Sequence, residues 1–370
     1  MSTVKPRISL VGAARPNFVK VAPLLKAIED DASVEFIHTG QHYDWEMSGG
    51  FFEDLDIGQP DKNLEIGSGT HAEQTAGVLV AFETHLLESK PDAVVVVGDV
   101  NSTLACSLAA SKLGIPVAHV EAGLRSRDWS MPEEVNRVLT DRLSCWLFTP
   151  SEDADLNLEA EGIAAERIHR VGNVMIDSLL SILPKARKEF DRLKAQLGMA
   201  DRYAILTLHR PSNVDGDVLL RLTDCLMEIG GEIPILFPVH PRTAQRLERI
   251  GFPVDGPISA IDPLGYRDFV SLMERSTVVF TDSGGIQEET SILGVPCITL
   301  RETTERPITS ELGTNQVVGS DPAAITAAMS KVKERKWEPA EIPLWDGMAA
   351  TRVAEVLLND LNQKRRASQC

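Results

Sequence analysis

The chain has 370 residues, of which 43% are hydrophobic and 25% charged, a composition typical of a soluble globular protein with two domains. The formal net charge of −17 argues against a broad nucleic-acid-binding or membrane-binding surface, while leaving room for a locally basic pocket that binds an anionic small molecule. Five scattered cysteines and no long apolar run predict neither a disulfide framework nor a membrane span, so we expect a cytoplasmic protein.

Short β-branched runs alternate with amphipathic segments along the first half of the chain. This alternation is typical of a parallel sheet covered by helices. The runs predicted to be strands are 7–12, 34–40, 93–99, 117–121, 146–149 and 168–172.

The same alternation restarts after a charged, helix-prone segment at 183–197, with predicted strands at 203–209, 233–240, 276–282 and 297–301. The sequence therefore predicts an α/β protein with two Rossmann-like, doubly wound domains, over 1–175 and 176–346. A helix over 347–366 is expected to return and complete the first domain. Because ligands of open α/β sheets bind beyond the carboxyl ends of the strands, we expect the active site in the interdomain cleft.

The segment Asp282-Ser283-Gly284-Gly285-Ile286-Gln287-Glu288-Glu289 connects a predicted strand to a helix. Glycines at such a turn let a diphosphate approach the backbone, and the helix N-terminus supplies free N–H donors. A carboxylate one turn on could bind ribose hydroxyls. A tight turn without a ligand explains this motif equally well on its own. Arg301 and Arg306 follow the next strand and could balance phosphate charge, or lie in a solvated loop.

Cations and carboxylates also follow the strands of the first half. Arg15 and Lys20 could clamp a phosphate, although surface cations are usually solvated. Asp99 could be an acid or base of the cleft, or the N-cap of the next helix. Glu121 directly follows an apolar strand, where an unpartnered charge is costly, which favours a function; an ion pair with Arg125 is the competing interpretation.

Glu133 begins another predicted helix, where it could be a third acid or base. It could equally complement the helix dipole and pair with Arg137 four residues on. His209 and His240 end successive strands of the second half and could bind phosphate or transfer a proton. No His spacing typical of a metal site occurs, and neither a dinucleotide-binding nor a Walker motif is present, so we expect no metal, NAD or ATP chemistry.

Taken in order, these motifs resemble the non-hydrolysing UDP-N-acetylglucosamine 2-epimerases. The resemblance covers about the first 320 residues, although Ala14 and Asn17 stand where familiar members have Thr and Glu. The matching motifs are 12–20, 38–42, 98–99, 119–126, 132–137, 171–173, 209–210, 238–240, 282–289 and 303–307.

The resemblance implies a GT-B-like pair of Rossmann domains that acts as a homodimer and supplies cell-surface polysaccharide synthesis. It also implies interconversion of UDP-N-acetylglucosamine (UDP-GlcNAc) and UDP-N-acetylmannosamine (UDP-ManNAc) without a cofactor. A base removes the C2 proton while UDP leaves C1, giving a 2-acetamidoglucal, and UDP adds back after protonation on the other face.

The resemblance also implies roles for individual residues. Asp99, Glu121 and Glu133 would be the acids and bases, and His209 would stabilise or protonate the departing diphosphate. The substrate would be bound by Arg15, Lys20, Gln41, His42, Arg137, His240, Phe269, Ser283, Gly284, Gly285, Glu289 and Arg306.

Four other functions fit parts of this pattern. The first is 2-epimerisation of a modified UDP-sugar, such as a UDP-diacetamido-uronic acid, for which extra basic residues at the sugar end would be expected. The second is a GT-B glycosyltransferase, which would depend on an acceptor. The third is a UDP-sugar-binding protein, which would need neither Asp99 nor Glu121. The fourth is hydrolysis to free N-acetylmannosamine and UDP.

Overall fold

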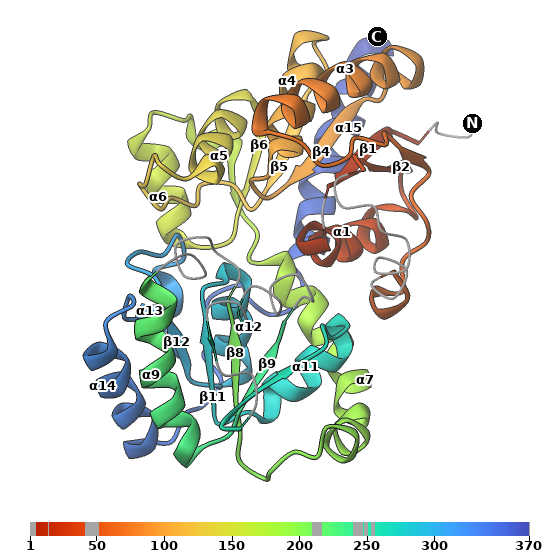
Figure 1. Ribbon diagram of the computed structural model, residues 1–370. Helices are drawn as coiled ribbons and strands as arrows, with labels where there is room; N and C mark the ends of the chain where they lie inside the picture. Colours follow the sequence, from red (N-terminus) through yellow and green to blue (C-terminus); the bar gives the residue numbers. More distant parts are fainter. Residues whose placement is uncertain are drawn as a thin grey trace. The chain divides into compact units, whose positions relative to one another are not determined.

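The computed structural model describes residues 5–13, 15–40, 52–208, 217–239, 247, 251–252 and 256–369, with only the backbone described for 15–16, 217–221 and 366–369. The chain divides into two compact units (Figure 1). Unit 1 comprises Met1–Ser181 and Pro343–Cys370, and unit 2 comprises Ile182–Ile342. Each unit is a parallel sheet with helices, which confirms the predicted α/β class.

The sheet of unit 1 has the strand order β3-β2-β1-β4-β5-β6-β7, and all of its pairs are parallel. The central strand β4 is buried along its whole length, as expected for a strand covered on both faces. The strands are β1 (Arg7–Gly12), β2 (Ser33–His38), β3 (Lys62–Asn63), β4 (Ala93–Val97), β5 (Val117–Val120), β6 (Trp146–Thr149) and β7 (Ile168–Arg170).

Amphipathic helices connect these strands. The N-terminus of one of them, α3, is fixed by a capping box in which Thr70 and Glu73 satisfy each other's backbone N–H groups. The helices are α1 (Arg15–Ile28), α3 (His71–Ser89), α4 (Asn101–Lys112), α5 (Pro132–Leu143), α6 (Glu152–Ala160), the 3-10 turn η1 (Ala165–Arg167), α7 (Val174–Leu197) and α15 (Ala349–Gln369).

The end of the chain returns to unit 1. The indole N–H of Trp345 donates to the carbonyl of Pro150 over 2.8 Å, and Asp177 accepts the first free backbone N–H groups of α15, from Ala349 and Ala350. Helix α15 packs on α1. The boundaries between the units lie at 181/182, inside α7, and at 342/343. The sequence-based prediction places them a few residues away, at 175/176 and 346/347.

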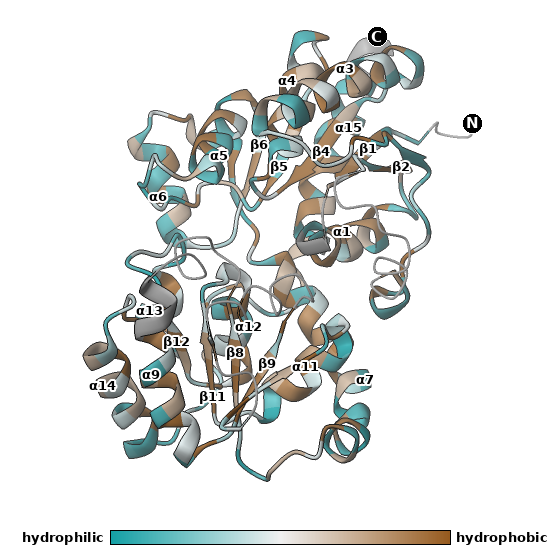
Figure 2. Ribbon diagram, in the orientation of Figure 1, coloured by the Kyte–Doolittle hydropathy of each residue, from teal (hydrophilic) through white to brown (hydrophobic). Residues whose placement is uncertain are grey.

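The sheet of unit 2 repeats the topology with six parallel strands in the order β10-β9-β8-β11-β12-β13. Apolar strands lie at the centre of each unit (Figure 2). The elements of unit 2 are β8 (Ala204–Thr207), α9 (Asp217–Glu232), β9 (Ile235–Pro238), β10 (Ile258–Ile261), α11 (Tyr266–Arg275), β11 (Val278–Thr281), α12 (Gly284–Leu293), β12 (Cys297–Thr299), α13 (Ile308–Glu311), β13 (Asn315–Val317) and α14 (Pro322–Glu334).

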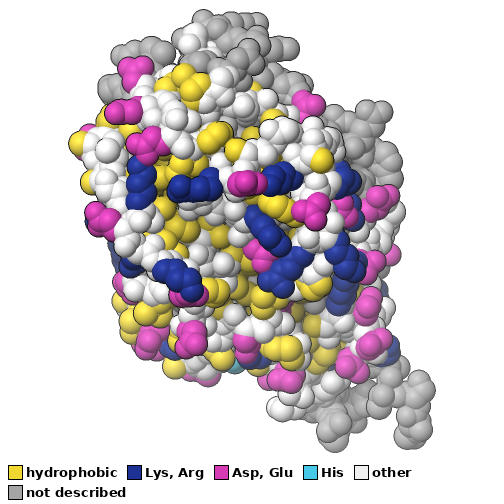
Figure 3. All heavy atoms as spheres, turned by 90° about the horizontal axis from the view of Figure 1, so that it is seen from below, with side chains coloured by type: hydrophobic (Ala, Val, Ile, Leu, Met, Phe, Trp, Pro, Cys, Tyr) yellow, Lys and Arg dark blue, Asp and Glu magenta, His cyan; other side chains and the backbone are white. Residues whose placement is uncertain are grey.

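Charges of both signs are mixed on the surface. One face carries Lys and Arg side chains among hydrophobic ones, with Asp and Glu side chains beside several of them (Figure 3). On unit 2, neighbouring charges of opposite sign form ion pairs, such as Arg187–Glu274 and Lys194–Asp201. Throughout the part of the chain that the structure describes, every helix is too short or too polar to cross a bilayer.

Candidate active site

The order of the strands reverses direction between β1 and β4 in unit 1. Connections leave these two neighbouring strands toward opposite sides, which opens a crevice at their carboxyl ends, the usual ligand site of such sheets. Asp99 follows β4 and Glu121 follows the adjacent strand β5. Two of the carboxylates selected from the sequence therefore lie on neighbouring strand ends at this edge.

Glu121 is paired with Lys20 of α1, whose ammonium group donates to Oε2 of the carboxylate. Both side chains are buried, with 7% of the Glu121 side chain and 8% of the Lys20 side chain exposed. The backbone of Glu121 has a φ of 73°, which is strained for a residue with a side chain. The alternative pairing with Arg125 was wrong, because Arg125 binds Asp141 and Glu161.

Gly98 lies directly beside the Lys20 and Glu121 side chains. Its φ of 67° is in the left-handed region, and a Cβ there would lie 3.1 Å from Lys20 Nζ and 3.3 Å from Glu121 Oε2. The amide nitrogen of Asn17 would be 3.3 Å away, and it donates to the carbonyl of Val97. A side chain at the end of β4 would therefore strain the backbone and crowd the Lys20–Glu121 pair.

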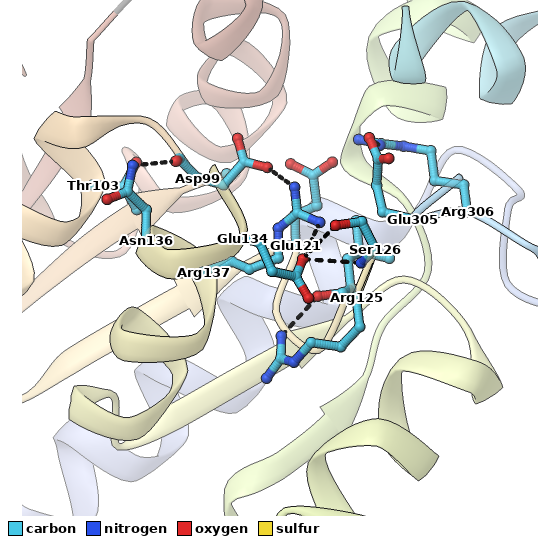
Figure 4. Close-up of polar contacts among 12 residues, drawn as sticks. Asp99, Thr103, Glu121, Arg125, Ser126, Glu134, Asn136, Arg137, Glu305 and Arg306 are labelled. Atoms are coloured by element: carbon cyan, nitrogen blue, oxygen red, sulfur yellow. Dashed lines mark hydrogen bonds and ion pairs between the residues drawn. The ribbon is translucent and has the colours of Figure 1, made fainter. Parts of the chain in front are cut away.

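Arg137 of α5 lies between two carboxylates (Figure 4). Its Nη2 donates to Asp99 Oδ2 over 2.5 Å and its Nη1 to Glu134 Oε2 over 3.0 Å. Arg137 and Glu134 are buried, whereas the Asp99 side chain is 29% exposed. Asp99 is thus held in place by a buried cation while it remains accessible to a ligand.

Glu134 is a residue that the sequence reasoning missed. It accepts hydrogen bonds of 2.9 Å from the backbone N–H and hydroxyl of Ser126 and from the backbone N–H of Arg127, and so anchors the loop after Glu121. The predicted Glu133, next to it, is partly exposed at the start of α5. Residues three apart on a helix are neighbours just as residues four apart are. The sequence therefore predicts a Glu134–Arg137 ion pair as well as it predicts a Glu133–Arg137 pair.

In unit 2 the strand order reverses between β8 and β11, and the diphosphate motif follows β11. Ser283 is the N-cap of α12, and Gly284 and Gly285 form its first turn, all three partly exposed. The first N–H groups of a helix have no partner within it, so this turn can bind an anion.

Two arginines and two glutamates form a buried network beside that turn. Arg306 donates through Nε to Glu288 over 2.7 Å and through Nη1 to Glu305 over 2.5 Å. Arg301 donates to the other oxygen of Glu305 over 2.7 Å. Both arginines are buried, so the solvated-loop interpretation of this segment was wrong. A Cβ on Gly284 would clash with the Arg306 guanidinium, which shows how closely the network approaches the helix N-terminus.

Glu289, one turn into α12, is almost completely buried and accepts a 2.7 Å hydrogen bond from the hydroxyl of Tyr266. Burial raises the pKa of this carboxyl to about 7; the Tyr266 hydrogen bond opposes the shift and the charge of Glu288 adds to it. Phe269 lies one turn along α11 from Tyr266 and is partly exposed.

The remaining predicted site residues are described less fully. Arg15 begins α1, but only its backbone is described. Gln41, His42, His209 and His240 lie outside the described residues. That the edges of the two units face one cleft also stays a prediction.

We expect Gly284→Ala to weaken UDP binding, because the new methyl group displaces Arg306 and covers the first N–H groups of α12. Overpacking against this buried network should also lower the free energy of unfolding by about 1–3 kcal/mol. Calorimetric titration with UDP and denaturant unfolding measure the two effects. Gly231→Ala is the matched control, because a Cβ at this glycine meets open space. Equal UDP affinity in the two variants would contradict the anion site.

Similar proteins identify the family of this chain. Residues 26–358 match the family model described as UDP-N-acetylglucosamine 2-epimerase. The protein named UDP-N-acetylglucosamine 2-epimerase from Methanocaldococcus jannaschii is 43% identical over 364 residues, which cover 95% of this chain and 98% of that protein. The crystal structure of the enzyme from that organism in complex with UDP-GlcNAc and UDP has a TM-score of 0.88, covering 95% of this chain and 99% of that one.

A relative with another substrate in its name is almost as similar. The UDP-2,3-diacetamido-2,3-dideoxy-D-glucuronate 2-epimerase of Pseudomonas aeruginosa is 40% identical, over 95% of this chain and 98% of that protein. The family match spans both units, and the similarity to these proteins runs nearly the full length of each. The chain belongs to the UDP-N-acetylglucosamine 2-epimerase family.

Proposed function

We propose that this protein interconverts UDP-GlcNAc and UDP-ManNAc by elimination and re-addition of UDP. The observation that carries the proposal is the pair of carboxylates at adjacent strand ends, Asp99 and Glu121, each bound by a buried cation. Relatives named for this reaction match both units, and one was crystallised with UDP-GlcNAc and UDP.

Asp99 and Glu121 act as the acid and base on opposite faces of C2, with Glu133 as a third candidate. The lysine beside Glu121 changes one earlier assignment. Because Lys20 is buried against that carboxylate, we assign it to orienting Glu121 in place of clamping a phosphate. Arg137 has the corresponding role for Asp99.

Unit 2 binds the UDP half of the substrate. The hydroxyl of Ser283, the N–H groups of Gly284 and Gly285 and the guanidinium of Arg306 hold the diphosphate, which is part of the leaving group of the elimination. Glu289 binds the ribose and Phe269 lies near the uracil. His209 and Arg15 complete the phosphate site, with Gln41, His42 and His240 also contacting substrate. No redox cofactor takes part.

We also propose that the enzyme acts in the cytoplasm as a homodimer. Exposed apolar side chains on α3 and α5, namely Val80, Leu87 and Leu139, support self-association, because both helices pack on α4 and belong to one helical layer. The second candidate substrate is a UDP-diacetamido-uronic acid. Arg127, exposed on the loop that Glu134 anchors, supports this candidate, because a C6 carboxylate needs a cation.

Proton NMR in heavy water with UDP-GlcNAc alone tests the reaction. We expect C2-deuterated UDP-ManNAc without any added cofactor, because the proton removed from C2 exchanges with solvent before it returns. Free N-acetylmannosamine would show hydrolysis instead. No C2 exchange with UDP-GlcNAc but exchange with the diacetamido-uronate substrate would favour the second candidate, and no exchange with either would contradict epimerisation.

A further inference from the structure

A histidine buried behind the two strand ends takes part in none of the chemistry proposed above. His119 lies in β5, two residues before Glu121, and its side chain is completely buried. Its Nε2 is 2.8 Å from the backbone carbonyl of Gly98, and its Nδ1 is 2.7 Å from Asp141 Oδ1 on α5. The imidazole therefore bridges the end of β4 and helix α5.

These partners determine where the protons of the imidazole lie. A backbone carbonyl only accepts hydrogen bonds, so Nε2 must carry a proton. Asp141 also receives Arg125 Nη1 over 2.7 Å and the backbone N–H of Gly123 over 3.2 Å at its other oxygen. Because every neighbour of this carboxylate is a donor, it is ionised, and Nδ1 must then donate to it as well. His119 thus carries two protons and a positive charge.

The charges of the network balance. His119 and Arg125 are positive, and Asp141 and Glu161, which accepts both Nε and Nη2 of Arg125, are negative. Burial opposes ionisation of Asp141, but the charges and hydrogen bonds of His119 and Arg125 outweigh it and set the pKa of Asp141 below its ordinary value. A neutral set of paired charges is the arrangement that a buried site tolerates.

The network reaches both reacting turns. The carbonyl that His119 holds belongs to the peptide that joins Gly98 to Asp99, and the N–H that Asp141 holds belongs to Gly123, two residues after Glu121. Gly98 and Gly123 adopt positive φ values without strain, whereas Glu121 between them along the chain has a φ of 73°, so the turn that carries this carboxylate is held in a conformation that needs support.

We propose that His119, held as an imidazolium by Asp141, is a positioning residue that fixes the two backbone turns from which Asp99 and Glu121 project. The proposal rests on the acid and base roles assigned to those two carboxylates. Neither His119 nor Asp141 touches the substrate; they act through the peptides that they hold.

Two variants test this role. Asp141→Asn places an amide N–H against existing donors, and His119→Gln leaves a single donor nitrogen where the imidazolium has one at each end. Each should lower kcat by about 100-fold through misplacement of the carboxylates, while KM and UDP affinity stay as in wild type. Glu35→Gln is the matched control. It alters a second carboxylate–histidine pair in unit 1, 3.1 Å from Oε2 to His85 Nε2, which holds no strand-end carbonyl, and should leave kcat unchanged.

Nitrogen-15 NMR of the wild-type enzyme provides a readout that does not depend on how the variants fold. Both ring nitrogens of His119, assigned through couplings to the backbone, should carry protons at neutral pH and protect them from exchange. A ring nitrogen without a proton would overturn the imidazolium.

The kinetic outcomes also separate the possibilities. Wild-type kcat in both variants, or a loss of kcat matched by equal losses of UDP affinity and thermal stability, would overturn the positioning role. If wild type itself shows no C2 exchange with either UDP-sugar, the proposed function fails and the role falls with it. If wild type is active and both variants keep its kcat, the proposed function stands and the positioning role does not.

Discussion

Asp99→Asn and Glu121→Gln are each expected to lower the rate of epimerisation by about 1,000-fold, the loss typical of removing a general acid or base. Each replacement keeps the shape of the side chain and removes the group that exchanges a proton with C2. Affinity for UDP should be largely unchanged, because its contacts are assigned to unit 2. Steady-state kinetics and calorimetric titration with UDP measure the two quantities.

The two variants should differ in stability, which separates a chemical role from a structural one. Glu121→Gln leaves the Lys20 ammonium buried without a carboxylate, at a cost of about 3–5 kcal/mol in the free energy of unfolding. Asp99 is partly exposed and its partner Arg137 keeps Glu134, so Asp99→Asn should cost much less. The double variant Lys20→Met with Glu121→Gln should recover stability and remain inactive. Wild-type turnover in both single variants would remove the acid and base assignment.

Glu289→Gln should make unit 2 more stable than wild type at pH 8 by about 3 kcal/mol, since one unit of pKa shift corresponds to about 1.4 kcal/mol. The folded pKa of Glu289 is about 7, above its ordinary 4.5. The folded protein therefore holds a proton that the unfolded chain releases between these values, and wild type loses this stability as pH rises from 4.5 through 7. Denaturant unfolding from about pH 4 to 8 measures the difference.

The same variant should bind UDP more weakly, because a carboxylate accepts hydrogen bonds from ribose hydroxyls at both oxygens and an amide at only one. Below the ordinary pKa of 4.5 the stabilities of variant and wild type should converge, which serves as the internal control. A difference in stability that does not vary with pH would show that Glu289 is already ionised in the folded protein. Unchanged UDP affinity would count against the ribose role.

The arrangement of strands was largely predictable, because short runs of β-branched residues such as 93–97 are typical of strands buried on both faces of a parallel sheet. Strands β10 and β13 were not predicted. They are three or four residues long, lie at the edge of their sheet and contain polar residues such as Ser259 and Gln316, so neither hydrophobicity nor alternation marks them.

The residue types of the site were predictable and their partners were not. Lys20 and Glu121 are 101 residues apart in sequence, and only the packing of α1 on the sheet brings them together. Glu133 and Glu134 differ by about 100° around their helix, so the choice between them depends on which face is buried. His119 gave no signal of its own, because its role depends on Asp141, which is 22 residues further along the chain, on α5.

Unit 1 consists of two segments of the chain with unit 2 between them, and this determines the order in which the two units can fold during synthesis. Unit 2 is continuous and is complete once residue 342 has emerged. The earlier-made unit must wait for Trp345 to reach Pro150 and for Asp360 to reach the indole of Trp146. Until then the apolar face that α15 covers, beside Val353 and Leu357, is open. The half that carries the reacting carboxylates is thus the first to be synthesised and the last to close.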